Sequence, residues 1–176
     1  MGKKIIAAIT SLGAEQIRLL LLIGWVLFMD LHSMTPATLS TEESSHVLLL
    51  ITELLTRLGI DSRWLTEHIL RKTAHFCEYS IFGMLLIWNF RNGRNRMRRQ
   101  RERGLPFLYP LALSVFAVPF LDETIQLFVP GRSAQISDVW LDIAGSCFGI
   151  LLYRLGLKVQ KGWRAGRRRR RRGWRY

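Results

Sequence analysis

Three long apolar stretches of this 176-residue chain carry ionisable side chains near one of their ends. His75 and Glu78 lie in the first stretch, Asp122 and Glu123 in the second, and Asp142 in the third. An ionisable group inside a membrane span is costly, about 2.5–3.5 kcal/mol for Asp, Lys or Arg at the bilayer centre on insertion scales. A chain that keeps several such groups at one depth is expected to use them in a polar site.

The basic residues are concentrated in two short segments. The chain is 49% hydrophobic and has a formal net charge of +13, a charge that in a soluble protein would suggest nucleic-acid binding. However, 17 of the 26 Lys and Arg residues lie in residues 91–103 and 158–176, and long apolar stretches separate these segments. The pattern favours a membrane protein, and no nucleic-acid partner is expected.

Four stretches have the length and composition of a membrane span, which needs about 20 mostly apolar residues. They cover residues 17–34, 70–90, 105–129 and 138–157. Residues 35–45 are polar and predict a loop, and 45–58 have the periodicity of a short amphipathic helix lying in the membrane interface. The predicted fold is all-α, a polytopic four-helix transmembrane bundle with one interfacial helix. The expected domain limits are a cytoplasmic segment 1–16, a transmembrane domain 17–157 and a disordered basic cytoplasmic tail 158–176.

The orientation in the membrane follows from the distribution of charge, because cytoplasmic segments are enriched in Lys and Arg. If the amino terminus lies inside, 21 of the 26 basic residues are cytoplasmic and 11 of the 13 acids lie toward the outer side. We therefore expect a multi-pass protein of a bacterial cytoplasmic membrane with both termini inside.

Helical spacing places the polar residues of each span on one face near the outer end. The stripes are Lys72, His75, Glu78 and Tyr79 in the second span, Asp122 and Gln126 with Glu123 beside them in the third, and Asp138 and Asp142 in the fourth. Gly145 and Gly149 continue the last stripe, and such a G-x-x-x-G pattern allows close helix approach, either within the bundle or in a homo-oligomer.

Residues near the ends of the spans have simpler interpretations beside the functional one. Arg132 lies in the short outer loop and can pair with an acid of the cluster or hold a phosphate or carboxylate. Asp138 can cap the fourth span. Asp30 and His32, at the outer end of the first span, can join the cluster, but the interpretation that we favour is that they only reach the membrane interface.

Two segments of the chain resemble motifs of the VanZ-like family of membrane proteins. RKTAHFCEYS resembles the family's K-x-x-H-F-x-x-Y element, and LDETIQLFVPGRSAQISDVWLDIAGSCFG resembles its D-E-x-x-Q-x-x-x-P-G-R…D-x-x-x-N-x-x-G element. The resemblance implies a polytopic membrane protein, and the family takes its name from a member linked to low-level teicoplanin resistance. One position departs from the pattern, since Asp142 stands where the family usually has Asn.

Three functions fit this cluster. The first is a pocket that binds a membrane lipid or lipid-linked envelope precursor headgroup, with Lys72 and Arg132 on phosphate and with Tyr79, Gln126, Asp138 and Asp142 as further binding residues. The second is an enzyme acting on such a lipid, in which His75, Glu78, Asp122 or Glu123 performs acid–base chemistry or holds a divalent metal. No G-x-S-x-G or H-E-x-x-H signature is present. The third is an ion-pair network that only joins the helices.

Overall fold

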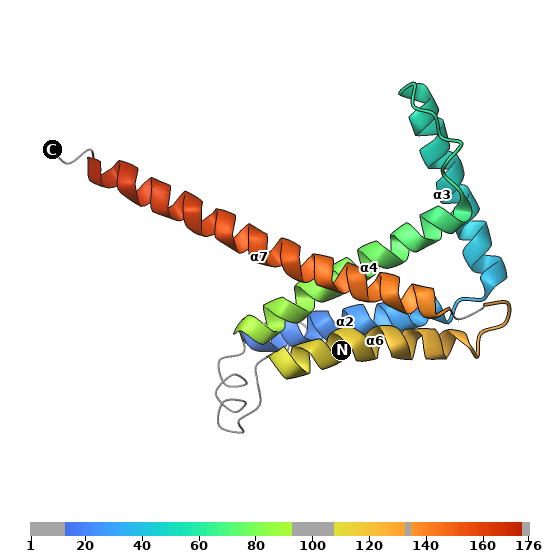
Figure 1. Ribbon diagram of the computed structural model, residues 1–176, viewed down its shortest axis with the longest axis horizontal. Coiled ribbons are helices and arrows are strands. Elements are labelled where there is room, and N and C mark those ends of the chain that lie inside the picture. Colours follow the sequence, from blue (N-terminus) through green and yellow to red (C-terminus); the bar gives the residue numbers. More distant parts are fainter. Residues whose placement is uncertain (1–12, 93–107, 133–134, 174–176) are drawn as a thin grey trace, which may run out of the picture.

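The protein is described by a computed structural model, which defines residues 13–92, 108–132 and 135–173 (Figure 1). Within these ranges the chain forms helices and no strands, which confirms the predicted all-α class. The helices are α2 Ala14–Ser33, α3 Ala37–Arg57, α4 Glu67–Asn92, α6 Leu108–Gln126 and α7 Ile136–Gly173. Most of the expected amino-terminal segment, the arginine-rich loop and the last three residues lie outside the described residues.

Helix α3 is longer than the sequence indicated, so the prediction of a loop over residues 35–45 is wrong. The helix begins at Ala37, directly after Pro36. Proline suits this position because its fixed φ, here −55°, is already close to that of a helix and its missing N–H has no partner to lose. The Ser45 hydroxyl donates to the Thr41 carbonyl inside the helix, which satisfies a polar side chain of a type that also favours turns.

Helix α4 is the centre of the bundle and contacts α2, α3, α6 and α7. In Figure 1 it crosses α7, with α2 and α6 alongside, whereas α3 stands away from the other helices. The core forms around the buried α4 residues Tyr79, Phe82 and Leu86, against which residues of the other helices pack: Met29, Leu111, Val115 and Ile143. Because of this packing, the amino-terminal end of α4 lies beside the carboxyl-terminal ends of α2 and α6 and the start of α7.

Small residues allow α4 and α7 to pack with their backbones in contact. A Cβ atom added at Gly145 would lie 2.7 Å from the Phe76 carbonyl oxygen, and one added at Gly149 would clash with the Ser80 carbonyl oxygen. The G-x-x-x-G pattern therefore allows α7 to pack against α4 within the bundle, which is one of the two roles expected from the sequence. This contact holds the acidic stripe of α7 against the polar stripe of α4.

The structure differs from the expected disordered tail, because α7 continues without a break to Gly173. Lys and Arg are good helix formers, and no proline interrupts residues 136–173. The helix projects well beyond the other helices toward the carboxyl terminus (Figure 1).

Among the described residues, one helical segment, Ile136–Arg167 of α7, is long and apolar enough to cross a membrane by length and composition. The other three expected spans are helical but do not meet the same criterion over the part of the chain that is described. Large apolar side chains are nevertheless exposed along the bundle, among them Leu31, Phe120 and Trp140. Exposed apolar area of this extent is typical of a surface that another apolar medium or partner covers.

Candidate functional site

A polar pocket of about 160 Å³ lies where the start of α4, the end of α6 and the start of α7 meet. Its walls include seven of the predicted site residues: Lys72, His75, Glu123, Gln126, Arg132, Asp138 and Asp142. Glu78, Tyr79 and Asp122, also predicted, do not line it. The pocket further contains His68, Arg71, Gly131, Gln135 and Leu141, which the sequence analysis did not select.

Two ion pairs join α4 to its neighbours at this end of the bundle. Lys72 Nζ lies 2.9 Å from Asp138 Oδ1 on α7. His32 Nδ1 lies 3.0 Å from Glu78 Oε1, which links α2 to α4. His32 is therefore part of the cluster, and the expectation that it only reaches the interface is wrong. Asp138 does lie in the first turn of α7, but its carboxylate pairs with Lys72.

The Lys72–Asp138 pair is expected to contribute modestly to stability, since its side chains are 33% and 30% exposed. A double-mutant cycle with Lys72→Ala and Asp138→Ala should give a coupling free energy of unfolding of about 1 kcal/mol, the upper end for such pairs. The more exposed Glu53–Arg57 pair of α3 is the matched control and should give about 0.3–0.5 kcal/mol. Equal coupling in the two cycles would contradict a structural role for the Lys72 pair.

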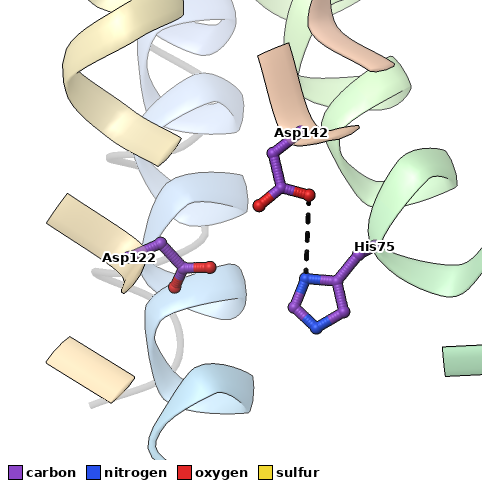
Figure 2. A group of neighbouring side chains, drawn as sticks. All are labelled: His75, Asp122 and Asp142. Atoms are coloured by element: carbon purple, nitrogen blue, oxygen red, sulfur yellow. Dashed lines mark ion pairs between the residues drawn. The ribbon is translucent and has the colours of Figure 1, made fainter. Parts of the chain in front are cut away.

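Beneath these pairs, His75, Asp122 and Asp142 converge from three different helices (Figure 2). His75 Nδ1 lies 3.9 Å from Asp142 Oδ1, a separation too long for a hydrogen bond. One nitrogen or oxygen atom from each of the three residues lies within 4.8 Å of the others. Asp122 is 1% exposed and Asp142 is fully buried, so these are the two most deeply buried acids of the described chain. The Tyr79 hydroxyl lies near enough to Asp122 to interact with its carboxyl group, but without the geometry of a hydrogen bond.

Several of the buried polar atoms here have no hydrogen-bond partner among the described residues. They are Asp122 Oδ1, both carboxylate oxygens of Asp142, the Tyr79 hydroxyl and Ser146 Oγ. Asp122 Oδ2 accepts a hydrogen bond of 3.4 Å from Gln126 Nε2. Buried polar groups in proteins are nearly always paired, so this concentration of unpaired atoms needs an explanation. It also argues against a network whose only role is to join the helices.

Arg132 is held by backbone carbonyls and not by an acid. Its Nε donates to the Thr35 carbonyl at 3.0 Å, and its Nη2 donates to the His32 carbonyl at 3.4 Å. The predicted pairing of Arg132 with an acid of the cluster is therefore not found in the described part of the chain. The reason is that residues 34–36 follow α2 directly and bring free carbonyl groups to the loop that carries Arg132.

Arg71 adds a second guanidinium to the same pocket. Burial lowers the pKa of Arg132 from its ordinary value, and the neighbouring positive charge of Arg71 lowers it further. Both side chains remain charged, because an arginine does not deprotonate at physiological pH. Arg71 Nε is buried and has no acceptor among the described residues. Two cations that repel each other thus face one pocket, which also contains the acids Glu123 and Asp138.

Comparison with known proteins gives one match. The family model described as VanZ/LLP1 matches residues 18–157, which include every residue of the pocket and of the buried cluster. No curated protein and no solved structure matched the chain.

Proposed function

This chain belongs to the VanZ/LLP1 family, and on that premise we propose that it is a multi-pass membrane protein whose pocket binds a phosphate-bearing headgroup. The headgroup belongs to a membrane lipid or a lipid-linked cell-envelope precursor at the outer surface of a bacterial cytoplasmic membrane. The family match and the apolar helix α7 support the membrane location. The pocket supports the ligand class.

The proposed topology has four spans, formed by α2, α4, α6 and α7, with α3 in the outer interface. Its support is the distribution of charge along the helices. Described basic residues at the end of the bundle away from the pocket include Arg18 of α2, Arg91 of α4 and Lys158 of α7. The end of a membrane protein that is rich in Lys and Arg faces the cytoplasm, which places the pocket outside and both termini inside.

The observation that carries the ligand assignment is the approach of Arg71 and Arg132 in one pocket. Lys72, the cation expected from the sequence to hold phosphate, is occupied by Asp138 at 2.9 Å. Arg71 retains an unpaired Nε–H, and a guanidinium is well matched to phosphate oxygens. In the proposal, Arg71 and not Lys72 therefore binds the phosphate together with Arg132.

The size and the remaining walls of the pocket limit what the headgroup can be. A volume of about 160 Å³ has room for a phosphate and a small polar group, not for a complete peptidoglycan precursor. Glu123 Oε2 accepts from the Gln135 backbone N–H at 3.1 Å, so its second oxygen can accept from a ligand hydroxyl or amine. The proposed ligand thus combines an anionic phosphate with a donor group.

The binding test uses the full chain in detergent and native mass spectrometry with phosphatidylglycerol or a polyprenyl phosphate. We expect Arg71→Ala and Arg132→Ala to weaken retention of both lipids by about 10- to 100-fold, because a charge-assisted hydrogen bond contributes about 1.5–3 kcal/mol. Arg63→Ala is the control, since Arg63 pairs with Asp61 and is 91% exposed outside the pocket. If both pocket variants retain lipid as the unchanged protein does, the proposal is wrong.

The same variants extend the test to resistance. In the proposal, expression of the protein in a susceptible bacterium raises the inhibitory concentration of teicoplanin, and the Arg71→Ala and Arg132→Ala variants lose this effect at equal membrane abundance. A phenotype that survives both substitutions separates resistance from the pocket.

An enzyme acting on the same lipid is a second candidate, and one observation favours it. His75 and Asp142 both line the pocket and lie 3.9 Å apart, a gap that would have to tighten with substrate bound before the carboxylate could orient a histidine base. Incubation of the protein with a labelled lipid-linked precursor distinguishes the two functions. Product that forms with the unchanged protein and is absent with His75→Gln favours the enzyme, and an unaltered precursor favours binding alone.

A further inference from the structure

We propose that His75, Asp122 and Asp142 bind one divalent transition-metal ion, of the class of Zn²⁺ or Mn²⁺. The inference does not depend on the headgroup assignment, because its three ligand residues are distinct from the two arginines that would hold the phosphate. It is carried by three observations: the convergence of the ligand atoms, their burial without partners, and their chemical type.

The spacing of the atoms fits a shared ion better than it fits direct contact. In a tetrahedral zinc site, ligand atoms that lie about 2.0–2.2 Å from the ion are about 3.4 Å from one another. His75 Nδ1 and Asp142 Oδ1 are 3.9 Å apart, which is beyond hydrogen-bond distance and about half an ångström wider than this spacing. The largest separation within the group, up to 4.8 Å, requires the side chains to close by as much as about 1.4 Å around the ion. Figure 2 shows both carboxyl groups directed toward the space beside the imidazole.

Burial provides the second, independent observation. Asp142 is fully buried and Asp122 is 1% exposed, yet Asp122 Oδ1 and both Asp142 oxygens have no hydrogen-bond donor among the described residues. A buried ionised carboxylate that lacks a donor is strongly disfavoured, so such a group either takes up a proton or requires a cation. Two of the described cations nearby have other partners, since Lys72 pairs with Asp138 and Arg132 donates to backbone carbonyls, and no ion pair joins the third, Arg71, to either carboxylate among the described residues. One divalent ion would neutralise both carboxylates.

The type of the three ligands narrows the class of ion. Imidazole suits Zn²⁺ and other transition metals, and carboxylates suit Mg²⁺, Ca²⁺ and Mn²⁺, so a mixed set favours Zn²⁺ or Mn²⁺ over Mg²⁺ or Ca²⁺. Three protein ligands leave at least one coordination position open. His75 and Asp142 also line the pocket, so this position faces the space where a water or an anionic ligand enters.

The sequence showed only part of this site. In the sequence, His75 and Asp122 are catalytic candidates. Asp142 is a binding candidate that stands where the family pattern usually has Asn. That exchange supplies the second carboxylate of the proposed site. A chain with Asn at this position would present one carboxylate and a neutral amide, which is a weaker set for a divalent ion.

The test measures metal content directly and uses no lipid or activity. The full chain, freed of any purification tag and of metal, is dialysed against ZnCl₂ or MnCl₂ and analysed by inductively coupled plasma mass spectrometry. We expect one ion per chain for the unchanged protein, and affinities more than about 10-fold weaker for Asp122→Asn and Asp142→Asn, since even residues that only orient a ligand change affinity about 10- to 100-fold.

Two further variants keep the result interpretable. Asp61→Asn removes an exposed carboxylate that is bonded to Arg63, and it should bind one ion as the unchanged protein does. If an Asn variant of the cluster fails to fold, His75→Gln in the Co²⁺-loaded protein replaces it, and loss of the visible absorption band is expected. Absence of bound metal in the unchanged protein, or equal binding in all the variants, overturns the proposal. Lipid retention is measured separately, so failure of either proposal leaves the other standing.

Discussion

Replacing Gly149 by alanine is expected to lower the free energy of unfolding by about 3 kcal/mol, the upper end of the range for overpacking a tight contact. The added Cβ would occupy the position of the Ser80 carbonyl oxygen on α4. A backbone carbonyl cannot turn away as the end of a flexible side chain can, so α4 and α7 must separate. That separation also disturbs the neighbouring contact of Gly83 with the Ser146 carbonyl.

Gly156→Ala is a matched control on the same helix, because a Cβ at Gly156 has no atom within 4 Å. This variant should be about 0.5–1 kcal/mol more stable, since alanine is the better helix former. Both variants can be compared in mixed detergent micelles by titration with a denaturing detergent, with helicity measured by circular dichroism. A Gly149→Ala variant as stable as Gly156→Ala would show that the two helices do not pack as described.

The positions of the helices could be predicted from the sequence because hydrophobic runs and turn residues report local structure. The spacing of Gly145 and Gly149 also indicated a close approach on the face of α7 that carries Asp142. Packing against Phe76 and Ser80 of α4 confirms that approach. The start of α3 was missed because the polar residues after Pro36 resemble a loop in composition although they are helical.

The partners of the site residues could not be predicted in the same way, because they depend on how each helix is rotated against its neighbours. Arg71 and Lys72 are adjacent, and consecutive residues of a helix point about 100° apart. This rotation directs Lys72 to Asp138, while Arg71 lies near Arg132. The contact between His32 and Glu78 likewise joins residues of two helices and leaves no periodic signal in the sequence.

The acids of the cluster fall into two groups once their partners are known. Asp138 and Glu78 have ion pairs that join helices, so they contribute to the architecture of the pocket. Asp122 and Asp142 are more deeply buried and have unpaired oxygens. Groups of the second kind reduce the stability of the protein alone and are retained where a ligand uses them. Acids of the same type within one cluster therefore have opposite expected effects when they are substituted.

The effect of Asp142→Asn on the free energy of unfolding is accordingly expected to change sign between metal-free and metal-containing solutions. In the presence of a chelator the variant should be about 2 kcal/mol more stable than the unchanged protein, because the amide is easier to bury than a carboxylate without a donor. At a free Zn²⁺ concentration about 1,000-fold above the dissociation constant, binding should stabilise the unchanged protein by about 4 kcal/mol. With an affinity about 100-fold weaker, the variant gains only about 1.4 kcal/mol from the same Zn²⁺ concentration, so the order of the two stabilities reverses.

Asp138→Asn separates this effect from a general response to removing an acid of the cluster. Its carboxylate pairs with Lys72 at 2.9 Å, so the variant should lose about 1 kcal/mol with chelator and with metal alike. The measurement is the same detergent titration, carried out on the three proteins in both solutions.

If Asp142→Asn is the less stable protein in chelator, the Asp142 carboxylate has a donor and stabilises the fold by itself. If the order of stabilities is the same in both solutions, the ion does not bind to this carboxylate. A reversal that occurs only for Asp142→Asn would show that the Asp142 carboxylate destabilises the metal-free protein and binds the ion.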